Sequence, residues 1–434
     1  MQFLKRILTF ILIVQSRLIL AKYKPFIVAV TGSVGKTSTK DAIYVALKGS
    51  SKHVRKSEKS MNSEIGLPLT VIGAPNAWHS LSGWLSNIGK GFGLIFRRSP
   101  YPDTLILEIG ADHPGDIRNI AKWLRPNIAV VTKVSRTPVH VEFFKSPEEV
   151  FQEKASLATS VRSGGVVVLF ADDEKVMSIA DMVKSKNIDV LSFGLNEKAS
   201  VRGTSGNIIY ESPSHPTGFE FGIEIDGKNY NTKINHAIGN VYMYPVLSAV
   251  AVAKAKGITA EVALQALSKY DVPKGRMNLI AGINDSTIID DTYNSSPDAV
   301  LSALATLKSL ETTGKKIAIL GDMMELGKYS SEEHRKIGKE LVGVVSEVVT
   351  VGTRSQLTAD EALKSGFITE NVHSFARSTE VADFIVPRIT SGDIILVKGS
   401  QSIRMERVVA SLLKEGQKAD RLLVRQEKEW LDKK

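Results

Sequence analysis

The stretch that most constrains the fold is FIVAVTGSVGKTSTK, residues 26–40. Its apolar run at 26–30 is typical of a buried parallel strand, and a helical pattern follows the glycine-containing loop. A strand, a glycine loop and a helix together cradle phosphates, because backbone N–H groups and the helix N-terminus face the anion. Lys36 would reach the outer phosphates and the Thr37 hydroxyl would bind Mg²⁺. We therefore predict a nucleoside triphosphate site.

The loop has the shorter spacing GxxGKT, because Val30 stands where the common GxxxxGK[ST] pattern has its first glycine. A GKT triplet also occurs in loops by chance, but the strand before it and the helix after it argue against chance here. The predicted phosphate-binding residues are Gly32, Ser33, Val34, Gly35, Lys36, Thr37 and Ser38.

Composition narrows the class of protein. A chain of 434 residues is long enough for two or three domains, and 43% hydrophobic with 24% charged residues argues against broad disorder. The absence of cysteine excludes disulfides and thiolate metal sites. The formal charge of +10 favours anionic ligands or an anionic membrane surface. No nucleic-acid-binding motif is present, so no nucleic acid partner is expected.

Residues 1–25 form an apolar segment that we predict to be a helix. Lys5, Arg6 and Arg17 interrupt it, and the uninterrupted run 7–14 is too short to cross a bilayer. A cleaved secretory signal is disfavoured, because cleavage would leave an ATP site outside the cytoplasm. We therefore expect a cytoplasmic protein.

Three roles stay open for this helix. The favoured role is packing on the protein body or at an oligomer interface. Peripheral contact of residues 1–22 with the inner face of the membrane comes second, and a membrane span comes last. The polar residues Gln2, Lys5, Thr9 and Ser16 would share one of its faces. The segment 78–98 is a second candidate for the same surface, but its apolar stripe at helical spacing is more typical of core. The stripe consists of Trp78, Leu81, Leu85, Ile88 and Phe92. The oligomeric state is left undetermined.

Two polar residues that follow predicted secondary structure elements are further candidates for the site. A buried strand at 104–107 ends in Glu108. A carboxylate at the carboxyl end of a strand beside a phosphate loop is placed to hold Mg²⁺; the alternative is a solvated strand-end glutamate. Asn62 lies in a loop after the first helix and is a weaker candidate for substrate binding. A GTPase base-reading motif is absent, since residues 132–135 lack its aspartate.

Together these residues and the later motifs resemble the Mur ligase family. The motifs are GxxGKTS after a strand, LEIGADHPGDI, His140 with Lys154, DDTYNSSPDAV, LGDMMELG and VKGSQSIRME, and the resemblance runs from about residue 26 to about 412. The later motifs are most similar to members that join D-alanyl-D-alanine to a UDP-N-acetylmuramoyl tripeptide in peptidoglycan precursor synthesis.

The resemblance implies an α/β fold in two domains. A central ATP-binding domain at 26–272 would have a P-loop-type, mostly parallel sheet with a small antiparallel sheet, since residues 219–225 alternate in polarity before the hairpin turn Asp226-Gly227. A Rossmann-like α/β domain would occupy 273–414, followed by a charged tail at 415–434.

The family also implies the chemistry of an ATP-dependent amide ligase. A carboxylate attacks the γ-phosphate to give an acyl phosphate and ADP, and an amine then displaces phosphate. By resemblance, Lys36 and one Mg²⁺ on Thr37 and Glu108 neutralise the phosphates, and a second Mg²⁺ takes His140 as a ligand. The lysine matching Lys154 is commonly carbamylated and then binds metal; an ordinary lysine on a helix starting at Pro147 stays the alternative.

Residues of the second domain take their roles from the same resemblance. Arg276 would contact adenine or phosphates, Asp291 the ribose hydroxyls, and Asn294 lies in the same loop. Three residues at strand ends would face the peptide or the amine: Asp322, Glu325 and Lys398. His334 matches a family histidine, although a histidine satisfied within its helix is an equal alternative.

The sequence departs from the family at two places. Val241, Tyr242 and Pro245 stand where the pattern GxHNxxN has histidine and asparagines, so adenine contacts there are in question. Only some 25 residues precede the first strand, where family members carry a UDP-binding domain. UDP would then be held by other surfaces or a partner, or the acid carrier would differ.

Two rival functions stay open. The first joins another amino acid to another acid, as in folyl-polyglutamate or cyanophycin formation; the motifs LGDMMELG and DDTYNSSP argue against it. The second is a membrane-associated nucleotide-binding protein without ligase activity. This second rival is disfavoured because the residues that the resemblance assigns to catalysis are all present, namely Lys36, Glu108, His140 and Lys154.

Overall fold

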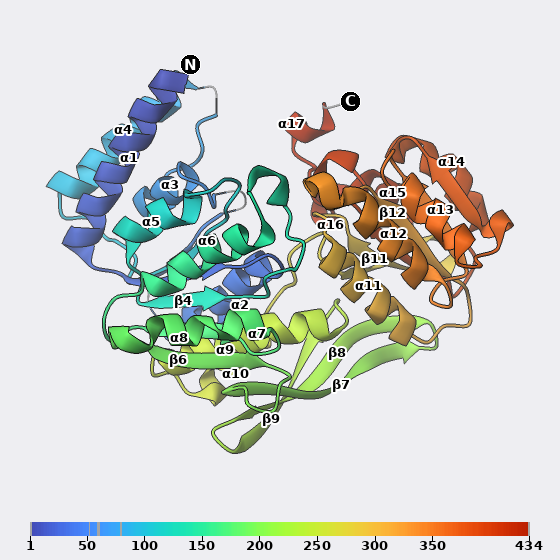
Figure 1. The fold of residues 1–434 in the computed structure, drawn as a ribbon, viewed down its shortest axis with the longest axis horizontal. Coiled ribbons are helices and arrows are strands. Elements are labelled where there is room, and N and C mark those ends of the chain that lie inside the picture. Colours follow the sequence, from blue (N-terminus) through green and yellow to red (C-terminus); the bar gives the residue numbers. More distant parts are fainter. Residues whose placement is uncertain (1, 52, 59–60, 79, 433–434) are drawn as a thin grey trace.

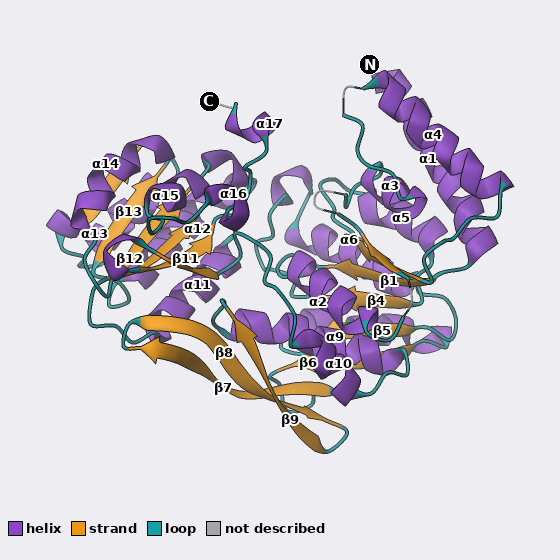
Figure 2. Ribbon diagram, turned by 180° about the vertical axis from the view of Figure 1, so that it is seen from behind, coloured by secondary structure: helices purple, strands orange, loops and turns teal. Residues whose placement is uncertain are grey.

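Two β-sheets organise the chain, each with its own helices (Figures 1 and 2). The computed structural model describes residues 2–51, 53–58, 61–78 and 80–432. The nine-stranded sheet belongs to the N-terminal lobe and has the order β2-β3-β1-β4-β5-β6-β7-β8-β9. The six-stranded sheet belongs to the C-terminal lobe and has the order β10-β11-β15-β12-β13-β14.

The first six strands of the large sheet are parallel, as their unbroken apolar runs predict. Helices follow these strands, so the carboxyl ends of the strands share one edge. The strands are β1 (Phe26–Thr31), β2 (Val54–Lys56), β3 (Thr104–Glu108), β4 (Ile128–Val131), β5 (Val166–Phe170) and β6 (Asp189–Gly194).

The expected antiparallel strands lie at the edge of this sheet and continue it. Strand β7 (Val201–Ser212) pairs in parallel with β6, β8 (His215–Ile225) pairs antiparallel with β7, and β9 (Lys228–Asn235) pairs antiparallel with β8. The turn between β8 and β9 is the predicted Asp226-Gly227, both residues with positive φ.

Helices of the N-terminal lobe form two groups around the sheet (Figure 1). One comprises α2 (Lys36–Lys48), α9 (Met243–Ala255) and α10 (Ala260–Leu267). The other comprises α5 (Asp116–Leu124), α6 (Pro147–Thr159), α7 (Glu174–Met177) and α8 (Ile179–Val183). Helix α6 begins where the sequence predicts, with Pro147 in its first turn and the Ser146 hydroxyl accepting from the Glu149 N–H at 3.3 Å.

The small sheet has one antiparallel edge strand, β10, and five parallel strands, in the Rossmann-like arrangement that the sequence predicts. The strands are β10 (Asn278–Ala281), β11 (Thr287–Asp291), β12 (Lys316–Gly321), β13 (Glu347–Val351), β14 (Val372–Phe375) and β15 (Ile394–Lys398). The helices are α11 (Pro297–Ser309), α12 (Ser330–Leu341), α13 (Gln356–Lys364), α14 (Val381–Ile385) and α15 (Glu406–Ser411).

The end of the chain packs back onto the C-terminal lobe. It forms α16 (Ala419–Leu422) and α17 (Lys428–Leu431). Between them the buried Arg425 donates to the carbonyls of Thr292 and Tyr293 and pairs with the buried Glu406. The tail therefore supports the loop that follows β11.

The predicted N-terminal helix is present as α1 (Gln2–Tyr23) and packs beside α3 (Gly66–Ile72) and α4 (Leu81–Phe96). Leu12, Ile19, Gln15 and Ser16 are buried in this packing. Residue 1 and the side chains of 2–5, with the predicted polar-face residues Gln2 and Lys5, lie outside the description. No helix in the described ranges is both long and apolar enough to span a bilayer.

The core interpretation of the stripe in 78–98 is wrong. The α4 residues buried against α1 and α3 include Asn87, Gly91 and Leu94, whereas the stripe residues Leu81 and Leu85 are largely exposed. The small Gly91 lets the Gln15 amide approach the α4 backbone, where it donates to the Ile88 carbonyl at 2.9 Å. The close helix contact therefore selects the glycine side of α4 and turns its bulky side outward.

Candidate active site

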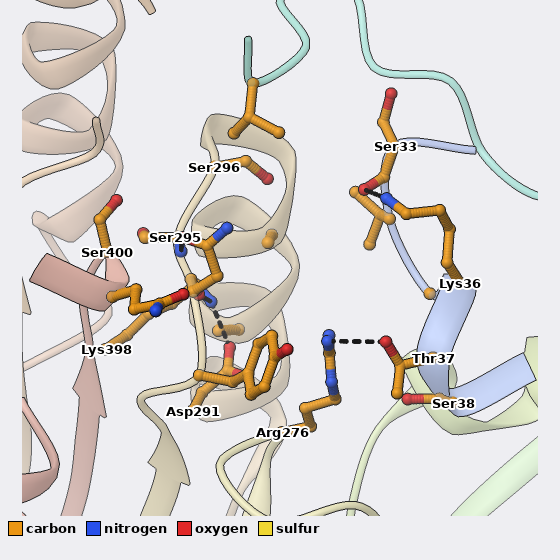
Figure 3. A pocket seen from close by; sticks show the side chains of 18 of the residues that line it. Ser33, Lys36, Thr37, Ser38, Arg276, Asp291, Ser295, Ser296, Lys398 and Ser400 are labelled. Carbon is orange, nitrogen blue, oxygen red and sulfur yellow. Dashed lines mark hydrogen bonds and ion pairs between the residues drawn. The ribbon is translucent and has the colours of Figure 1, made fainter. Parts of the chain in front are cut away.

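A cleft of about 720 Å³ lies between the two lobes and gathers most of the residues that the sequence singles out. Figure 3 shows the phosphate loop on one side and the β11 loop with Lys398 on the other. Predicted residues that line the cleft are Ser33, Val34, Gly35, Lys36, Thr37, Ser38, Asn62, Glu108, His140, Arg276, Asp291, Asn294, Glu325 and Lys398.

The phosphate loop has the conformation that its glycines allow. Gly35 has φ 84° and immediately precedes α2, and Gly32 has φ 146°. A Cβ on Gly32 would lie 1.9 Å from Oγ1 of Thr132, which donates to the Val34 carbonyl at 2.8 Å. Only glycine fits at position 32, because the loop packs directly against the chain after β4.

Two lysine ammonium groups meet on this loop. Lys36 Nζ donates to the carbonyls of Gly32 at 3.0 Å and Ser33 at 3.3 Å. Lys154 Nζ, from the middle of α6, donates to the same Gly32 carbonyl at 3.0 Å. The sequence separates these lysines by more than a hundred residues, and the fold brings them to one oxygen atom.

Lys154 is buried, and its environment disfavours its charge. Burial, followed by the neighbouring Lys36 cation, lowers the pKa of Lys154 to about 7, although Glu153 and Asp112 act in the opposite direction. Burial likewise lowers the pKa of Lys36, with Glu108 opposing and Arg276 adding to the effect. Burial therefore disfavours the charged form of both lysines, and an anion bound beside them would offset that cost.

Glu108 stands at the end of β3, as predicted, and contacts the phosphate loop. Its Oε1 accepts from the Thr37 hydroxyl at 3.1 Å, and its Oε2 lies 3.6 Å from the buried Lys40 Nζ. Backbone pairing sets this position, because β3 and β1 align Glu108 with Val30.

His140 lies between the lobes. Its Nδ1 is 3.0 Å from Glu325 Oε2 of the C-terminal lobe, and its Nε2 is 3.5 Å from Asp112 Oδ1 of the N-terminal lobe. The contact with His140 lowers the pKa of Glu325. His140 and Glu325 both have positive φ, with values of 69° and 64°, so both sit in tight turns that reach into the gap.

Arg276 joins the second lobe to the phosphate loop. Its Nη2 donates to the Thr37 hydroxyl at 3.1 Å, and its guanidinium lies 4.2 Å from the centre of the Tyr293 ring. Figure 3 shows Arg276 reaching from below toward Thr37. Stacking on an aromatic ring holds a guanidinium in place while leaving its N–H groups free to direct toward anions.

The buried Lys398 and the partly buried Asp291 form an ion pair at the ends of β15 and β11. Lys398 Nζ lies 2.6 Å from Asp291 Oδ2 and also donates to the Asn294 carbonyl at 2.9 Å. Burial raises the pKa of Asp291, with Lys398 opposing. Lys398 therefore positions the Asp291 loop, and both residues line the cleft.

Asp322 does not follow the prediction of a substrate-facing group. It is buried, and its Oδ1 accepts from the Ser355 N–H at 2.7 Å, so it fixes the turn after β13. In the described part of the chain it is not among the cleft-lining residues. His334 is also satisfied within the protein: Nε2 accepts from the Met323 N–H at 3.0 Å and Nδ1 lies 2.7 Å from the Ser330 carbonyl.

Sequence reasoning missed several residues at this site. Asp112 contacts His140 and influences the pKa of both cleft lysines, and its position just after the Glu108 strand was the available signal. Tyr242 lines the cleft and its hydroxyl donates to the Arg276 carbonyl. Arg404, which lies within the motif VKGSQSIRME, and Trp430 also line the cleft, and no local pattern in the sequence marks Trp430.

The protein groups fit part of a magnesium coordination shell. Thr37 and Glu108 present oxygens next to each other at the mouth of the phosphate loop. In the ranges that the structure describes, no three His, Asp or Glu side chains converge on one point. Mg²⁺ in proteins is usually held by one or two carboxylates together with substrate phosphates and water, which matches this partial set.

Comparison with known proteins gives the family. The Mur ligase middle domain matches residues 94–253, and the Mur ligase glutamate ligase domain matches residues 275–401. The UDP-N-acetylmuramoyl-tripeptide–D-alanyl-D-alanine ligase of Mycobacterium tuberculosis (strain CDC 1551 / Oshkosh) is 30% identical over 406 residues, covering 89% of this chain and 72% of the relative. The chain belongs to the Mur ligase family.

Other Mur ligases give the same picture. The enzyme of the same name from Bacillus subtilis (strain 168) is 28% identical over 397 residues, covering 89% of this chain and 76% of its own. The MurF ligase of Thermotoga maritima, solved in complex with ADP, has a TM-score of 0.75 at 25% identity, covering 93% of this chain and 83% of its own. Mur ligases are ATP-dependent ligases, so the predicted fold class and enzyme class are confirmed.

Gly32→Ala should destabilise the protein and abolish nucleotide binding, because the new methyl meets Thr132 Oγ1. We expect a loss of about 2–4 kcal/mol in the free energy of unfolding, combining overpacking with a positive φ. Gly164→Ala is the matched control, since Gly164 also has a positive φ but open space around it. Urea denaturation of both variants and of Gly32→Ala/Thr132→Ala, which should recover part of the loss, checks the explanation; equal losses in the two single variants contradict it.

The lowered pKa of Lys154 predicts a pH-dependent stability. Between the folded value of about 7 and the ordinary 10.5, the unfolded chain binds a proton that the folded chain does not. The free energy of unfolding should therefore rise with pH in this window, by up to about 1.4 kcal/mol per pH unit. Lys154→Met removes this slope. Urea denaturation in CO₂-free buffer at several pH values measures the difference, and parallel curves for the two proteins would refute the lowered pKa.

Proposed function

We propose that this Mur ligase joins D-alanyl-D-alanine to the carboxyl end of a UDP-N-acetylmuramoyl tripeptide, with ATP converted to ADP and phosphate. The observation that carries the proposal is the convergence of Lys36 and Lys154 on the Gly32 carbonyl, in the phosphate loop whose residues 33–38 line the cleft. An acid-activating ligase must bring a carboxylate against a triphosphate, and Lys36 together with Arg276 supplies cationic charge at this loop, where the two anions would meet. The curated relatives named above act on these substrates.

The first step makes the acyl phosphate. The substrate carboxylate oxygen bonds to the γ-phosphorus while the bond to the β-phosphate oxygen breaks and ADP leaves. Lys36 would turn from the loop carbonyls to the outer phosphates, and Arg276 would approach them from the second lobe. The same groups would stabilise the charge on the transferring phosphoryl group, since they are placed before the reaction begins.

The second step makes the amide. The amine nitrogen of D-alanyl-D-alanine attacks the acyl carbon, the bond to phosphate breaks, and the amine loses a proton. Glu325, in contact with His140 across the lobes, lies in the cleft where it would accept such a proton. Asn62, which also lines the cleft, would orient the peptide acid.

We expect two magnesium ions at this site, as the resemblance to the family implies. Thr37 and Glu108 would hold the first, and His140 with a modified Lys154 would contribute to the second. Bound Mg²⁺ supplies charge neutralisation of the phosphates and polarisation of the γ-phosphoryl group.

Lys154 has the properties that carbamylation needs. Only a neutral amine adds to CO₂, forming an N–C bond with loss of a proton, and a pKa of about 7 leaves a large neutral fraction at physiological pH. The product is an anion beside Lys36, so it would replace a repulsion between two cations by an ion pair. The buried position on α6 would protect it from water.

The nucleoside end of ATP would lie toward the second lobe. Asp291 and Asn294 would accept hydrogen bonds from the ribose hydroxyls. Lys398 and Arg425 hold the loop that carries these two residues in place. Val241, Tyr242 and Ala303 line the same cleft and offer an apolar surface for adenine in place of polar contacts. Contacts from both lobes imply that the lobes close on ATP.

The units of this proposal are the four ranges predicted from the sequence: an N-terminal helix at 1–25, a central ATP-binding domain at 26–272, a C-terminal domain at 273–414 and a charged tail at 415–434. We propose that the enzyme works in the cytoplasm, where ATP and a nucleotide-linked precursor are available.

The defining assay measures phosphate release and product mass with ATP, Mg²⁺, UDP-muramoyl tripeptide and D-alanyl-D-alanine, leaving out one substrate at a time. Phosphate release that requires both acid and amine is expected. Lys36→Ala should lower kcat by at least about 10³-fold, because the transferring phosphoryl group loses its lysine. Lys145→Ala, on an exposed lysine away from the cleft, should match wild type. Release that is independent of the amine contradicts the proposal.

Lys154→Ala should lose activity and regain part of it with added formate or acetate. The small carboxylate would occupy the space of the missing carbamate and restore a metal ligand. Chloride at the same ionic strength is the control. Glu108→Ala lacks a different metal ligand, so added formate or acetate should restore less of its activity. Full activity of Lys154→Ala without additives would rule out the carbamate.

A further inference from the structure

The face of the N-terminal lobe farthest from the C-terminal lobe is built by two parallel helices, α1 and α4, which lie side by side in both views (Figures 1 and 2). Gln15 of α1 donates to the Ile88 carbonyl of α4. One turn and more along both helices, Lys22 donates to the Leu94 carbonyl at 2.8 Å and to the Arg97 carbonyl at 2.6 Å. The polar groups of α1 thus hold the pair together from within.

Both helices turn apolar side chains to the outside. On α4, Leu81 is 82% exposed, Leu85 70% and Phe96 80%. On α1, Phe10 is 68% exposed, and Ile7, Val14 and Leu18 continue the same stripe at helical spacing. Trp78, just before α4, is 72% exposed. Exposed apolar residues usually occur singly on a monomer, so two adjacent stripes mark an interaction surface.

The two segments also carry nearly all of the net charge of the protein. Residues 1–24 contain five basic residues and no acidic one: Lys5, Arg6, Arg17, Lys22 and Lys24. Residues 65–102 contain three basic residues, Lys90, Arg97 and Arg98, and again no acidic one. These eight charges compare with a formal net charge of +10 for the whole chain, so the rest of the molecule is close to neutral.

We propose that the α1–α4 surface docks on an anionic lipid bilayer. Apolar stripes, a tryptophan at their end and flanking cations without anions are the features of a helix pair lying in the membrane interface. A second copy of this chain is the less favourable occupant, because it would bring eight like charges of each protomer toward those of the other. An acidic lipid surface neutralises them.

The location of the surface leaves the enzyme free to work. The cleft lies between the lobes, and α1 and α4 lie at the outer end of the N-terminal lobe (Figure 1). Among the residues that the structure describes, none that lines the cleft comes from α1 or α4. Docking would therefore hold the enzyme at the bilayer with the cleft accessible, and the membrane test is independent of the ligase assay.

The test uses the full chain and vesicle flotation. Wild type should float with vesicles of phosphatidylcholine mixed with an equal amount of phosphatidylglycerol and remain in solution with phosphatidylcholine alone. Binding should fall when NaCl is raised from about 0.1 M to about 1 M, which shortens the Debye length from about 10 Å to about 3 Å. Tryptophan emission should shift to the blue on binding, and Trp78→Phe should reduce the shift.

Matched variants separate the two contributions. Leu81→Ser/Leu85→Ser/Phe96→Ser should lower vesicle partitioning at least about tenfold, since the apolar area that enters the interface is lost. Its control is Val262→Ser/Leu363→Ser/Ile368→Ser, which replaces exposed apolar residues of α10 and of the C-terminal lobe. This control should partition like wild type. Arg17→Gln/Arg97→Gln/Arg98→Gln should also lower vesicle partitioning about tenfold or more. The control Lys336→Gln/Lys364→Gln/Lys414→Gln, which removes three charges elsewhere on the surface, should partition like wild type.

The outcomes decide the proposal. Retained melting temperature and ligase activity in the α4 variant, together with lost flotation, support it. Equal flotation of the α4 variant and its control overturns it. Light scattering that shows a wild-type dimer, converted to monomer by the α4 substitutions and without vesicle binding, also overturns it and assigns the surface to a second copy.

Discussion

The geometry of the cleft depends on one backbone carbonyl, that of Gly32, which accepts from both Lys36 and Lys154. For this to happen, the loop after β1 must be a glycine turn packed against Thr132, and α6 must cross the same edge of the sheet. Two cations held this closely repel each other, and burial makes the repulsion stronger. The arrangement is therefore costly while both lysines are charged, and the cost falls when Lys154 loses its proton or when an anion binds beside the pair.

The second lobe completes the site through a small number of buried polar groups. Arg276 reaches the phosphate loop, and the Asp291–Lys398 pair fixes the loop that would hold the ribose. Arg425, from the end of the chain, bonds to the carbonyls of that same loop. Direct contacts also join the lobes, since Lys133 pairs with Asp298 and Thr137 bonds to Glu333. Separating the lobes would thus remove both substrate contacts and these pairs.

The proposed membrane surface and the cleft differ in where they place their polar and apolar side chains. In the cleft, cations gather around a polar loop between two lobes, whereas α1 and α4 place their small and polar residues inward and their apolar residues outward. Gly91 and Gln15 show why: close approach of the helix backbones needs a glycine and a bonded amide at the contact. The apolar residues that remain then face away from the protein, and the basic residues beside them determine the kind of surface that could cover them.

Local pattern was sufficient for much of this protein. The apolar strand, the glycine loop, the Pro147 helix start, the Asp226-Gly227 turn and the Glu108 strand end are short-range features, and each lies where the sequence predicts because backbone sterics and parallel pairing dictate it. Only the tertiary structure decided that Asp322 caps a turn, that Asp112 joins His140, that Arg425 supports the β11 loop and that the α4 stripe is exposed. Those outcomes depend on contacts between residues distant in the chain, and helical spacing alone cannot tell which face of a helix meets the protein.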